Sequence, residues 1–187
     1  MASPPRENLV VLDFDDTMVV TGARRTVLYD QWGELDRTLV KLYRTLQNLG
    51  TCVVITNASR DWVTTYVRTR LPRFNALMCK DHIYSARDVY SHDRISDRVQ
   101  ERWKVEMVRL VIKMLYPDLR LLKQVVGIGD KSWDRQAILT LYDVIPDTIF
   151  KSIKLMEMPR AEDLMGQHIF LTERMPGISG APYHCDY

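Results

Sequence analysis

Acidic, hydroxyl and amine side chains occur in four separate stretches of the sequence, in types that suit one kind of chemistry. In chain order they are Asp13, Asp15, Asp16, Thr17, Thr56, Asn57, Lys104, Asp130 and Asp134. Carboxylates that are brought together repel one another, and their removal from water costs several kcal/mol each unless a cation compensates. A hard divalent ion such as Mg²⁺, which prefers oxygen ligands, would meet that need.

An acidic cluster neutralised in this way can transfer a phosphoryl group. One carboxylate can attack phosphorus, and another, two residues further along and beyond a turn, can protonate the leaving oxygen. A hydroxyl and an ammonium group would then hold the equatorial phosphoryl oxygens. This chemistry requires that the fold bring the four stretches together.

Short apolar runs predict the strands that would have to position these residues. Four runs are rich in branched apolar residues, too short for helices and bounded by polar or turn residues, as is typical of strands buried on both faces. They cover residues 9–12, 52–55, 124–128 and 149–155. A weaker run over residues 82–85 predicts a fifth strand.

Helical periodicity fills the segments between these runs. Leucines recur at steps of four and three over residues 35–49, and Gly50 is expected to end that helix in a left-handed cap. A second helix is expected over residues 59–70, with Ser59 as its N-cap and Pro72 preventing its extension. Three further helices are predicted, respectively, from the apolar stripe Trp103, Met107, Leu110 and Met114, from the buried face Ile138, Leu141 and Tyr142, and over residues 160–171.

Five strands that alternate with helices predict a doubly wound, Rossmann-like α/β domain with a mostly parallel sheet. We expect one domain over residues 1–187, with its core at about 8–172 and frayed ends. In such sheets the ligand crevice lies beyond the carboxyl ends of the strands. The aspartates, Thr56 and Asn57 all follow predicted strands, so we expect them to share one rim with Lys104.

The overall composition excludes several classes of protein. The 187 residues are 46% hydrophobic and 27% charged, which excludes a disordered or coiled-coil chain. The net charge of +2 does not indicate nucleic-acid binding. Three cysteines without CxxC spacing favour a reducing compartment, and no apolar run is long enough to span a membrane. A cytoplasmic protein without membrane contact is expected.

The four stretches resemble the motifs of the haloacid dehalogenase (HAD) superfamily. Residues 13–17, Asp-Phe-Asp-Asp-Thr after an apolar strand, match its DxDx[T/V] motif, which is quite specific. Thr56 and Lys104 fit the second and third motifs, which are weak by themselves. Residues 129–134, Gly-Asp-Lys-Ser-Trp-Asp, fit the GDxxxD motif, and order and spacing agree from residue 9 to about 155.

The resemblance implies a catalytic role for two aspartates. Asp13 would be the nucleophile that forms an aspartyl-phosphate, and Asp15 the general acid that later activates water. The dehalogenases that name the superfamily lack the second aspartate, and its ATP-driven pumps carry threonine there. Asp15 therefore indicates a phosphatase or a phosphomutase, and we expect a Mg²⁺-dependent hydrolase of phosphate monoesters.

The resemblance also implies binding roles for the other residues. The residues expected to bind the phosphoryl group are Thr56, Asn57 and Lys104. The expected ligands of Mg²⁺ are Asp13, the main-chain carbonyl of Asp15, Asp130 and, directly or through water, Asp134.

One position departs from the pattern of the superfamily, and the lysine of the third motif has several candidates. Asp16 stands where glycine is common. Lys104 competes for its role with Lys113, Lys123 and Lys131, and we prefer it because it lies near the start of a predicted helix.

The spacing of the motifs leaves little room for a cap domain over the site. Only 33 residues separate Thr17 from Thr51, and the 46 residues between Asn57 and Lys104 are already occupied by predicted elements. An open site gains few contacts from a small metabolite. The phosphorylated substrate could therefore be a protein or another macromolecule, and the oligomeric state stays open.

Other interpretations compete with the phosphatase. The chain could be a catalytically weak binding or regulatory protein of the same fold, or a metal-dependent nuclease, because acidic clusters also hold two Mg²⁺ ions there. A receiver domain fits less well, since its central strand should end in aspartate. Taken singly, Thr56 could satisfy backbone, Asp130 and Asp134 could cap a helix, and Lys104 could be solvated.

Arginine, tryptophan and histidine side chains are further candidates for contact with a substrate or a metal ion. Arg94, Arg98 and Arg102 lie at helical spacing and are expected to form a solvated face rather than a substrate contact. Of the tryptophans, only Trp133 is expected near the crevice. No chemistry is assigned to the four histidines, His82, His92, His168 and His184, which show no metal-binding spacing.

Overall fold

The computed structural model describes residues 6–21, 27–90 and 96–187 and contains one six-stranded sheet in which every pair is parallel. The strand order is β3-β2-β1-β4-β5-β6. The strands are β1 (Asn8–Leu12), β2 (Thr51–Thr56), β3 (Ile83–Ser85), β4 (Gln124–Gly129), β5 (Ile149–Lys154) and β6 (Cys185–Asp186). The chain winds outward from β1 through β3 and then returns to add β4 through β6, so the order reverses between β1 and β4.

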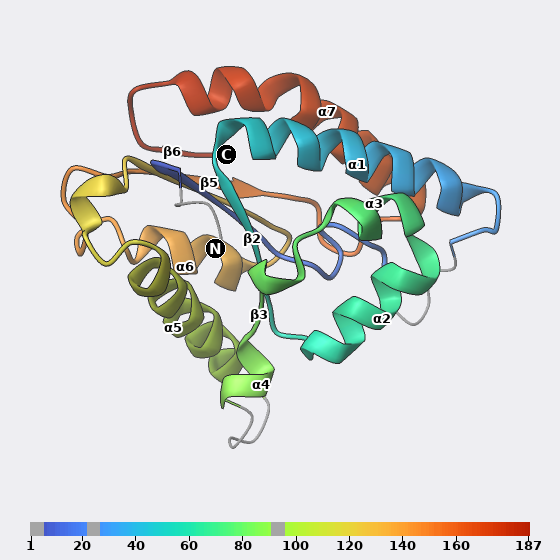
Figure 1. Cartoon of the computed structure of the whole chain (residues 1–187), viewed down its shortest axis with the longest axis horizontal. Helices are drawn as coiled ribbons and strands as arrows, with labels where there is room; N and C mark the ends of the chain where they lie inside the picture. Colours follow the sequence, from blue (N-terminus) through green and yellow to red (C-terminus); the bar gives the residue numbers. More distant parts are fainter. Residues whose placement is uncertain (1–5, 22–26, 91–95) are drawn as a thin grey trace.

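Helices cover both faces of this sheet (Figure 1). One layer consists of α1 (Gln31–Leu49), α2 (Arg60–Arg70), α3 (Pro72–Leu77) and α7 (Ala161–Gly180). The other consists of α4 (Ala86–Tyr90), α5 (Asp97–Leu115) and α6 (Ser132–Leu139). Two short 3₁₀ turns, Lys80–His82 and Leu119–Leu121, complete the described elements. Among these helices, none combines the length and the apolar composition that a membrane span requires.

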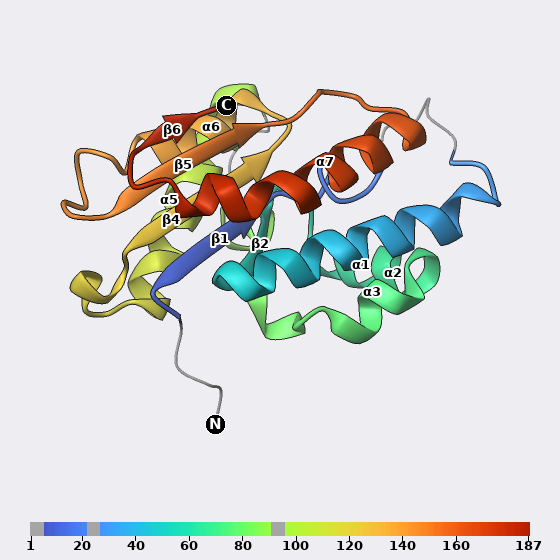
Figure 2. The same cartoon turned by 90° about the horizontal axis from the view of Figure 1, so that it is seen from above.

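Strand side chains feed two separate cores, because successive residues of a strand point to opposite faces. Val10 and Leu12 of β1 belong to the core beneath α1 and α7, whereas Leu9 and Val11 belong to the core beneath α5. Figure 2 shows α1 and α7 running side by side across their face of the sheet. The α/β class and the parallel sheet are thus confirmed.

The end of the chain differs from the sequence-based expectation. The last helix does not stop near Leu171 but continues to Gly180, and residues 185–186 add a sixth strand where fraying was expected. Long-range bonds hold this segment: the Tyr187 N–H donates to Ser152 O at 2.9 Å, and the Lys154 N–H donates to Tyr187 O at 2.8 Å. These partners lie far apart in sequence, so no local pattern could show them.

Two local predictions were wrong. Gly50 is extended (φ −176°, ψ −173°) rather than left-handed. It must be glycine for another reason, since a Cβ there would lie 2.4 Å from Asn8 O at the start of β1. Tyr142 is not part of a buried helix face; it lies beyond α6 and is 50% exposed.

Candidate functional site

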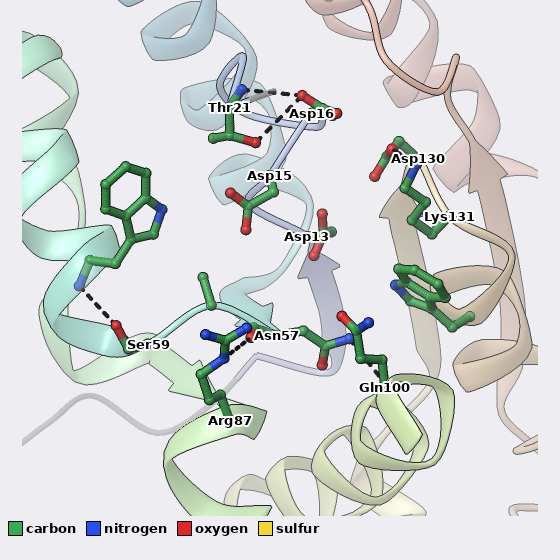
Figure 3. A pocket seen from close by; sticks show the side chains of 13 residues that line it. Asp13, Asp15, Asp16, Thr21, Asn57, Ser59, Arg87, Gln100, Asp130 and Lys131 are labelled. Atoms are coloured by element: carbon green, nitrogen blue, oxygen red, sulfur yellow. Dashed lines mark hydrogen bonds and ion pairs between the residues drawn. The ribbon is translucent and has the colours of Figure 1, made fainter. Parts of the chain in front are cut away.

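A pocket of about 520 Å³ lies at the carboxyl ends of the central strands. Four of the predicted site residues line it, namely Asp13, Asp15, Asn57 and Asp130. Figure 3 shows the three aspartates pointing into it from the ends of neighbouring strands. The other three predicted residues, Thr56, Lys104 and Asp134, lie close behind its wall and are largely buried. The fold therefore brings all seven to one edge of the sheet, as the strand-end argument predicts.

Lys104 is the buried cation at the centre of this arrangement. Ser96 caps α5 by accepting a bond from Val99 N–H, and Lys104 follows in the second turn with only 2% exposure. Its Nζ donates to Asp13 Oδ1 and to Ile55 O, each at 2.5 Å, and lies 2.9 Å from Asp134 Oδ1. Three partners in fixed positions hold the ammonium group against the end of β1.

Electrostatics around Lys104 favour its charged form. Burial alone would lower the pKa of this amine, but the adjacent carboxylates of Asp13 and Asp134 raise it above its ordinary value. The competing lysines are placed differently. Lys113 and Lys123 are exposed, and Lys131 pairs with Asp130 at 3.2 Å and with Glu157 at 3.0 Å.

Three carboxylates form a compact cluster beside this lysine. One oxygen from each of Asp13, Asp130 and Asp134 lies within 4.8 Å of the others. Burial is the main cause that raises the pKa of Asp13 well above its ordinary range, with Asp134 adding to the effect and Lys104 opposing it. Burial likewise raises the pKa of Asp130 to about 6. The cluster holds more negative charge than Lys104 and Lys131 compensate.

The donor set of this cluster fits a hard divalent cation. All three groups are carboxylates, which Mg²⁺ prefers, and Asp134 Oδ1 and Asp130 Oδ2 each face a lysine, Lys104 at 2.9 Å and Lys131 at 3.2 Å. Crowding three carboxylates around two buried or half-buried lysines is costly without a further cation. Asp13, Asp130 and Asp134 could thus hold a metal ion.

Asp15 occupies a position distinct from that cluster. Its Oδ2 accepts a bond from Thr56 Oγ1 at 3.4 Å, and its side chain faces the pocket. Burial raises the pKa of Asp15, which favours the protonated form that a general acid needs. Asp13 and Asp15 therefore present two carboxyl groups to the same pocket in different surroundings.

The turn after β1 explains how Asp13 and Asp15 reach that pocket. The Asp13 N–H donates to Ile128 O at 2.9 Å and continues the pairing of β1 with β4. Asp16 then adopts φ 58°, the left-handed region in which glycine is favoured. Its Oδ1 accepts a bond from Thr21 N–H at 3.2 Å, a contact that glycine could not make. The departure from the common glycine thus keeps the backbone shape and adds a side-chain tie.

Thr56 and Asn57 both make structural contacts, in addition to the phosphate-binding role predicted for them. Thr56 Oγ1 accepts a bond from the Ala58 N–H at 3.0 Å, so it satisfies backbone while it contacts Asp15. Asn57 lines the pocket, but its side-chain amide donates to Gln100 O at 3.2 Å and ties the loop to α5. Both residues fix the end of β2 against its neighbours.

Asp134 likewise has two roles, and Gly129 makes them possible. Asp134 Oδ2 accepts a bond from the Lys131 N–H at 3.1 Å and caps α6, while Oδ1 faces Lys104. A Cβ on Gly129 would lie 2.4 Å from the Cβ of Asp134. Only glycine lets the first turn of α6 approach β4 closely enough to bring Asp134 to Lys104.

The structure adds residues that the sequence interpretation missed. Trp62 lines the pocket together with Trp133, although only Trp133 was expected there. Arg87 and Gln100 line it as well. Arg87 could have been found, because it is the second residue after β3 and the strand-end rule applies equally to that strand. Trp62 and Gln100 belong to helices and carry no comparable signal.

The remaining expectations concern α5 and the histidines. Arg98 and Arg102 are exposed on α5, in keeping with a solvated face, while Arg94 and His92 lie outside the described residues. His168 is fully buried: its Nε2 lies 3.0 Å from Thr17 O and its Nδ1 lies 3.4 Å from Thr38 Oγ1. It therefore contacts the loop that carries the first motif, a link that no sequence spacing reveals.

Comparisons of the chain with protein-family models, with curated proteins and with solved structures found no match. None of them identifies a HAD superfamily member, so that resemblance stays a prediction drawn from the four motifs.

Proposed function

We propose that the protein is a Mg²⁺-dependent phosphatase of the HAD type, which hydrolyses a phosphate monoester through an aspartyl-phosphate on Asp13. The observation that carries this proposal is the buried ammonium group of Lys104, 2.5 Å from Asp13 and 2.9 Å from Asp134 beside an open pocket. Buried charges joined across three distant segments cost more than apolar packing would. Such an arrangement is typical of a site kept for chemistry.

Mg²⁺ would be held by Asp13, Asp130 and Asp134, with the main-chain carbonyl of Asp15 as a further ligand. When bound, the ion would neutralise the cluster and polarise a phosphoryl oxygen. The close approach of the three carboxylates and the raised pKa of Asp13 support this assignment.

The chain's own groups would carry out two proton-coupled steps. Lys104 binds Oδ1 of Asp13, which leaves Oδ2 to attack phosphorus. As the new bond forms, the bond from phosphorus to the leaving oxygen breaks, and Asp15 gives that oxygen its proton. Asp15, now a carboxylate, takes a proton from the water that hydrolyses the aspartyl-phosphate, so phosphate leaves and both aspartates return to their starting forms.

The described part of the chain leaves this pocket open, since the helices between β2 and α5 belong to the two layers that cover the sheet. A phosphorylated protein or another macromolecule is therefore our proposed class of substrate. We also place the protein in the cytoplasm, because its three cysteines are unpaired.

Turnover of p-nitrophenyl phosphate with Mg²⁺ tests the proposal. Asp13→Asn should lower kcat by at least about 1,000-fold, because the amide cannot act as the nucleophile. Asp143→Asn, which changes an exposed aspartate outside the pocket, should keep full activity. Melting temperatures of both variants control for folding.

The same assay separates the competing functions. Turnover retained in Asp13→Asn would overturn the phosphatase proposal. Cleavage of phosphodiesters that is insensitive to Asp13→Asn would indicate a nuclease. Binding of Mg²⁺ or phosphate without turnover on a broad panel of phosphate esters would indicate a regulatory protein of this fold.

A further inference from the structure

The pocket has a second side whose chemistry differs from that of the acidic cluster. Arg87 lies in the first turn of α4, directly beyond the end of β3, and lines the pocket. Figure 3 shows its side chain entering from the α4 side, across from Asp13 and Asp15. Its Nε donates to Asn57 O at 3.1 Å, which fixes the plane of the guanidinium group.

The terminal nitrogens of Arg87 have no partner within the described ranges, 6–21, 27–90 and 96–187. The Nε bond to Asn57 O is its only hydrogen bond there, and it forms no ion pair with any acid of those ranges. Its neighbour Asp88 is engaged elsewhere, since its Oδ2 accepts a bond from the Arg60 N–H at 2.9 Å. Arg87 thus directs a charged, partly anchored group at the pocket with its terminal donors available.

The other cations at this site are already committed. Lys104 is held by Asp13, Asp134 and Ile55 O, and Lys131 pairs with Asp130 and Glu157. Of the described residues that line the pocket, Arg87 is therefore the cation that has no acidic partner. A guanidinium group in this state matches the two oxygens of a carboxylate or a phosphate through parallel N–H bonds.

The position of Arg87 relative to the proposed reaction separates its ligand from the reacting phosphoryl group. Thr56 contacts Asp15, and the next residue, Asn57, bonds Arg87 through its carbonyl. Arg87 thus approaches the pocket from the far side of the loop that follows β2. A ligand group bound by Arg87 would therefore belong to a part of the substrate other than the phosphoryl group that is removed at Asp13.

We propose that Arg87 selects substrates that carry a second anionic group, a carboxylate or a phosphate, in addition to the phosphoryl group removed at Asp13. This inference rests on the proposed phosphatase function. It gives an open pocket a source of specificity that requires no cap domain, because one charged, two-pronged contact can distinguish related substrates.

Matched substrates test the proposal through kcat/KM with Mg²⁺. The series is phenyl phosphate, the three isomeric carboxyphenyl phosphates and the three phenylene bisphosphates. We expect the wild type to prefer at least one doubly anionic isomer over phenyl phosphate by about tenfold or more, beyond the statistical factor of two for a bisphosphate. The carboxylate and bisphosphate arms show which second group Arg87 takes.

Substitutions of Arg87 assign the preference to this side chain. Arg87→Gln should abolish the preference while kcat/KM for phenyl phosphate stays within about twofold, and Arg87→Lys, which keeps the charge but not the two-pronged geometry, should retain part of it. Arg68→Gln removes the same charge from an exposed position of α2 outside the pocket and should change nothing. Melting temperatures of all variants control for folding.

The outcomes separate this inference from the function on which it rests. A wild type that shows no preference for any doubly anionic isomer, or a preference that survives in Arg87→Gln, overturns the role of Arg87 even if Asp13→Asn abolishes turnover. If the wild type turns over none of the substrates, the phosphatase proposal fails, and calorimetric binding of the same compounds decides about Arg87. Tighter binding of a doubly anionic compound that Arg87→Gln removes supports its role; equal binding overturns it.

Discussion

Two buried lysines lie near opposite ends of the sheet and differ in their partners. Lys104, 2% exposed, faces the carboxylates of Asp13 and Asp134 at the carboxyl ends of the strands. Lys151, 0% exposed in the first half of β5, donates instead to neutral main-chain carbonyls at the end of α7. These carbonyls belong to Ile178, Ser179, at 3.0 Å, and Ala181, at 2.6 Å.

The partners set the electrostatics of the two amines in opposite directions. Burial lowers the pKa of Lys151, with Cys185 opposing it, and no carboxylate of the described residues pairs with this amine. The pKa of Lys104 is raised, because its two carboxylates outweigh burial. The carbonyls that Lys151 binds lie at the C-terminal end of α7, where the regular bonds within a helix run out. One amine thus balances an acidic site, and the other completes the backbone bonds of a helix, so a buried charge by itself does not reveal function.

The sharpest test of this contrast is Lys104→Met. Loss of the ammonium group should raise the pKa of Asp13 further and leave it protonated, so kcat for p-nitrophenyl phosphate should fall at least about 100-fold to 1,000-fold. Lys113→Met, on the exposed face of the same helix, is the matched control. Activity within tenfold of the wild type, in a folded Lys104→Met protein, would remove Lys104 from the proposed mechanism.

The converse substitution, Lys151→Met, should change stability and spare activity. Three carbonyls at the end of α7 lose the ammonium donor, although Ile178 O keeps the Ala181 N–H and Ser179 O keeps the Gln124 side-chain amide. The free energy of unfolding in urea should therefore fall by about 2 kcal/mol, while kcat stays within about twofold. Lys154→Met, on the same strand and 30% exposed, should cost less than about 1 kcal/mol. A large loss of activity in stable Lys151→Met protein would contradict the structural role.

His168 extends the comparison to a second polar side chain that is bonded to neutral groups. Burial lowers its pKa from the ordinary 6.5 to about 4. Between pH 6.5 and pH 4 the imidazole is therefore protonated in the unfolded chain but neutral in the folded chain. The contribution of His168 to the free energy of unfolding is complete above pH 6.5 and is lost as the pH falls toward 4. Between pH 7 and pH 5 the loss should reach about 2 kcal/mol.

Urea unfolding of the wild type and of His168→Gln at both pH values isolates this effect from the aspartates, whose raised pKa values act in the opposite direction. Glutamine does not titrate, so the variant should lose less stability between pH 7 and pH 5 than the wild type does. Equal losses in the two proteins would show that His168 takes up no extra proton on unfolding.

Local patterns predicted the parts of the fold that depend on local sequence. Branched apolar runs identified β1, β2, β4 and β5, and the N-cap at Ser59 is confirmed by its bond from the Trp62 N–H at 3.3 Å. The element α3 was missed because its N-terminal amides, those of Arg73 and Phe74, donate to Asp36 on α1 at 3.0 and 2.9 Å. A helix of six residues that is capped from another helix leaves no local signature.

The candidate site likewise contains residues that the local sequence predicts and residues whose positions depend on the packing of distant elements. Asp13, Asp15 and Asp130 could be predicted because each follows a strand whose sequence is recognisable. Lys104 could be placed near the site, but its contact with Asp134 depends on the close approach at Gly129. Trp62 reaches the pocket only because α2 packs beside the end of β1, which is a property of the assembled layers.

The shortest strand, β6, has a consequence for how copies of the chain behave toward one another. Its two residues pair with Lys151 and Ser152, and Asp186 is tied to Arg135 of α6 at 2.8 Å. Without this segment, β5 would become an outermost strand with open N–H and C=O groups, a surface on which foreign strands can add. Removal of residues 181–187 would therefore expose the unpaired edge of β5. We expect the shortened protein to aggregate before its catalytic activity changes.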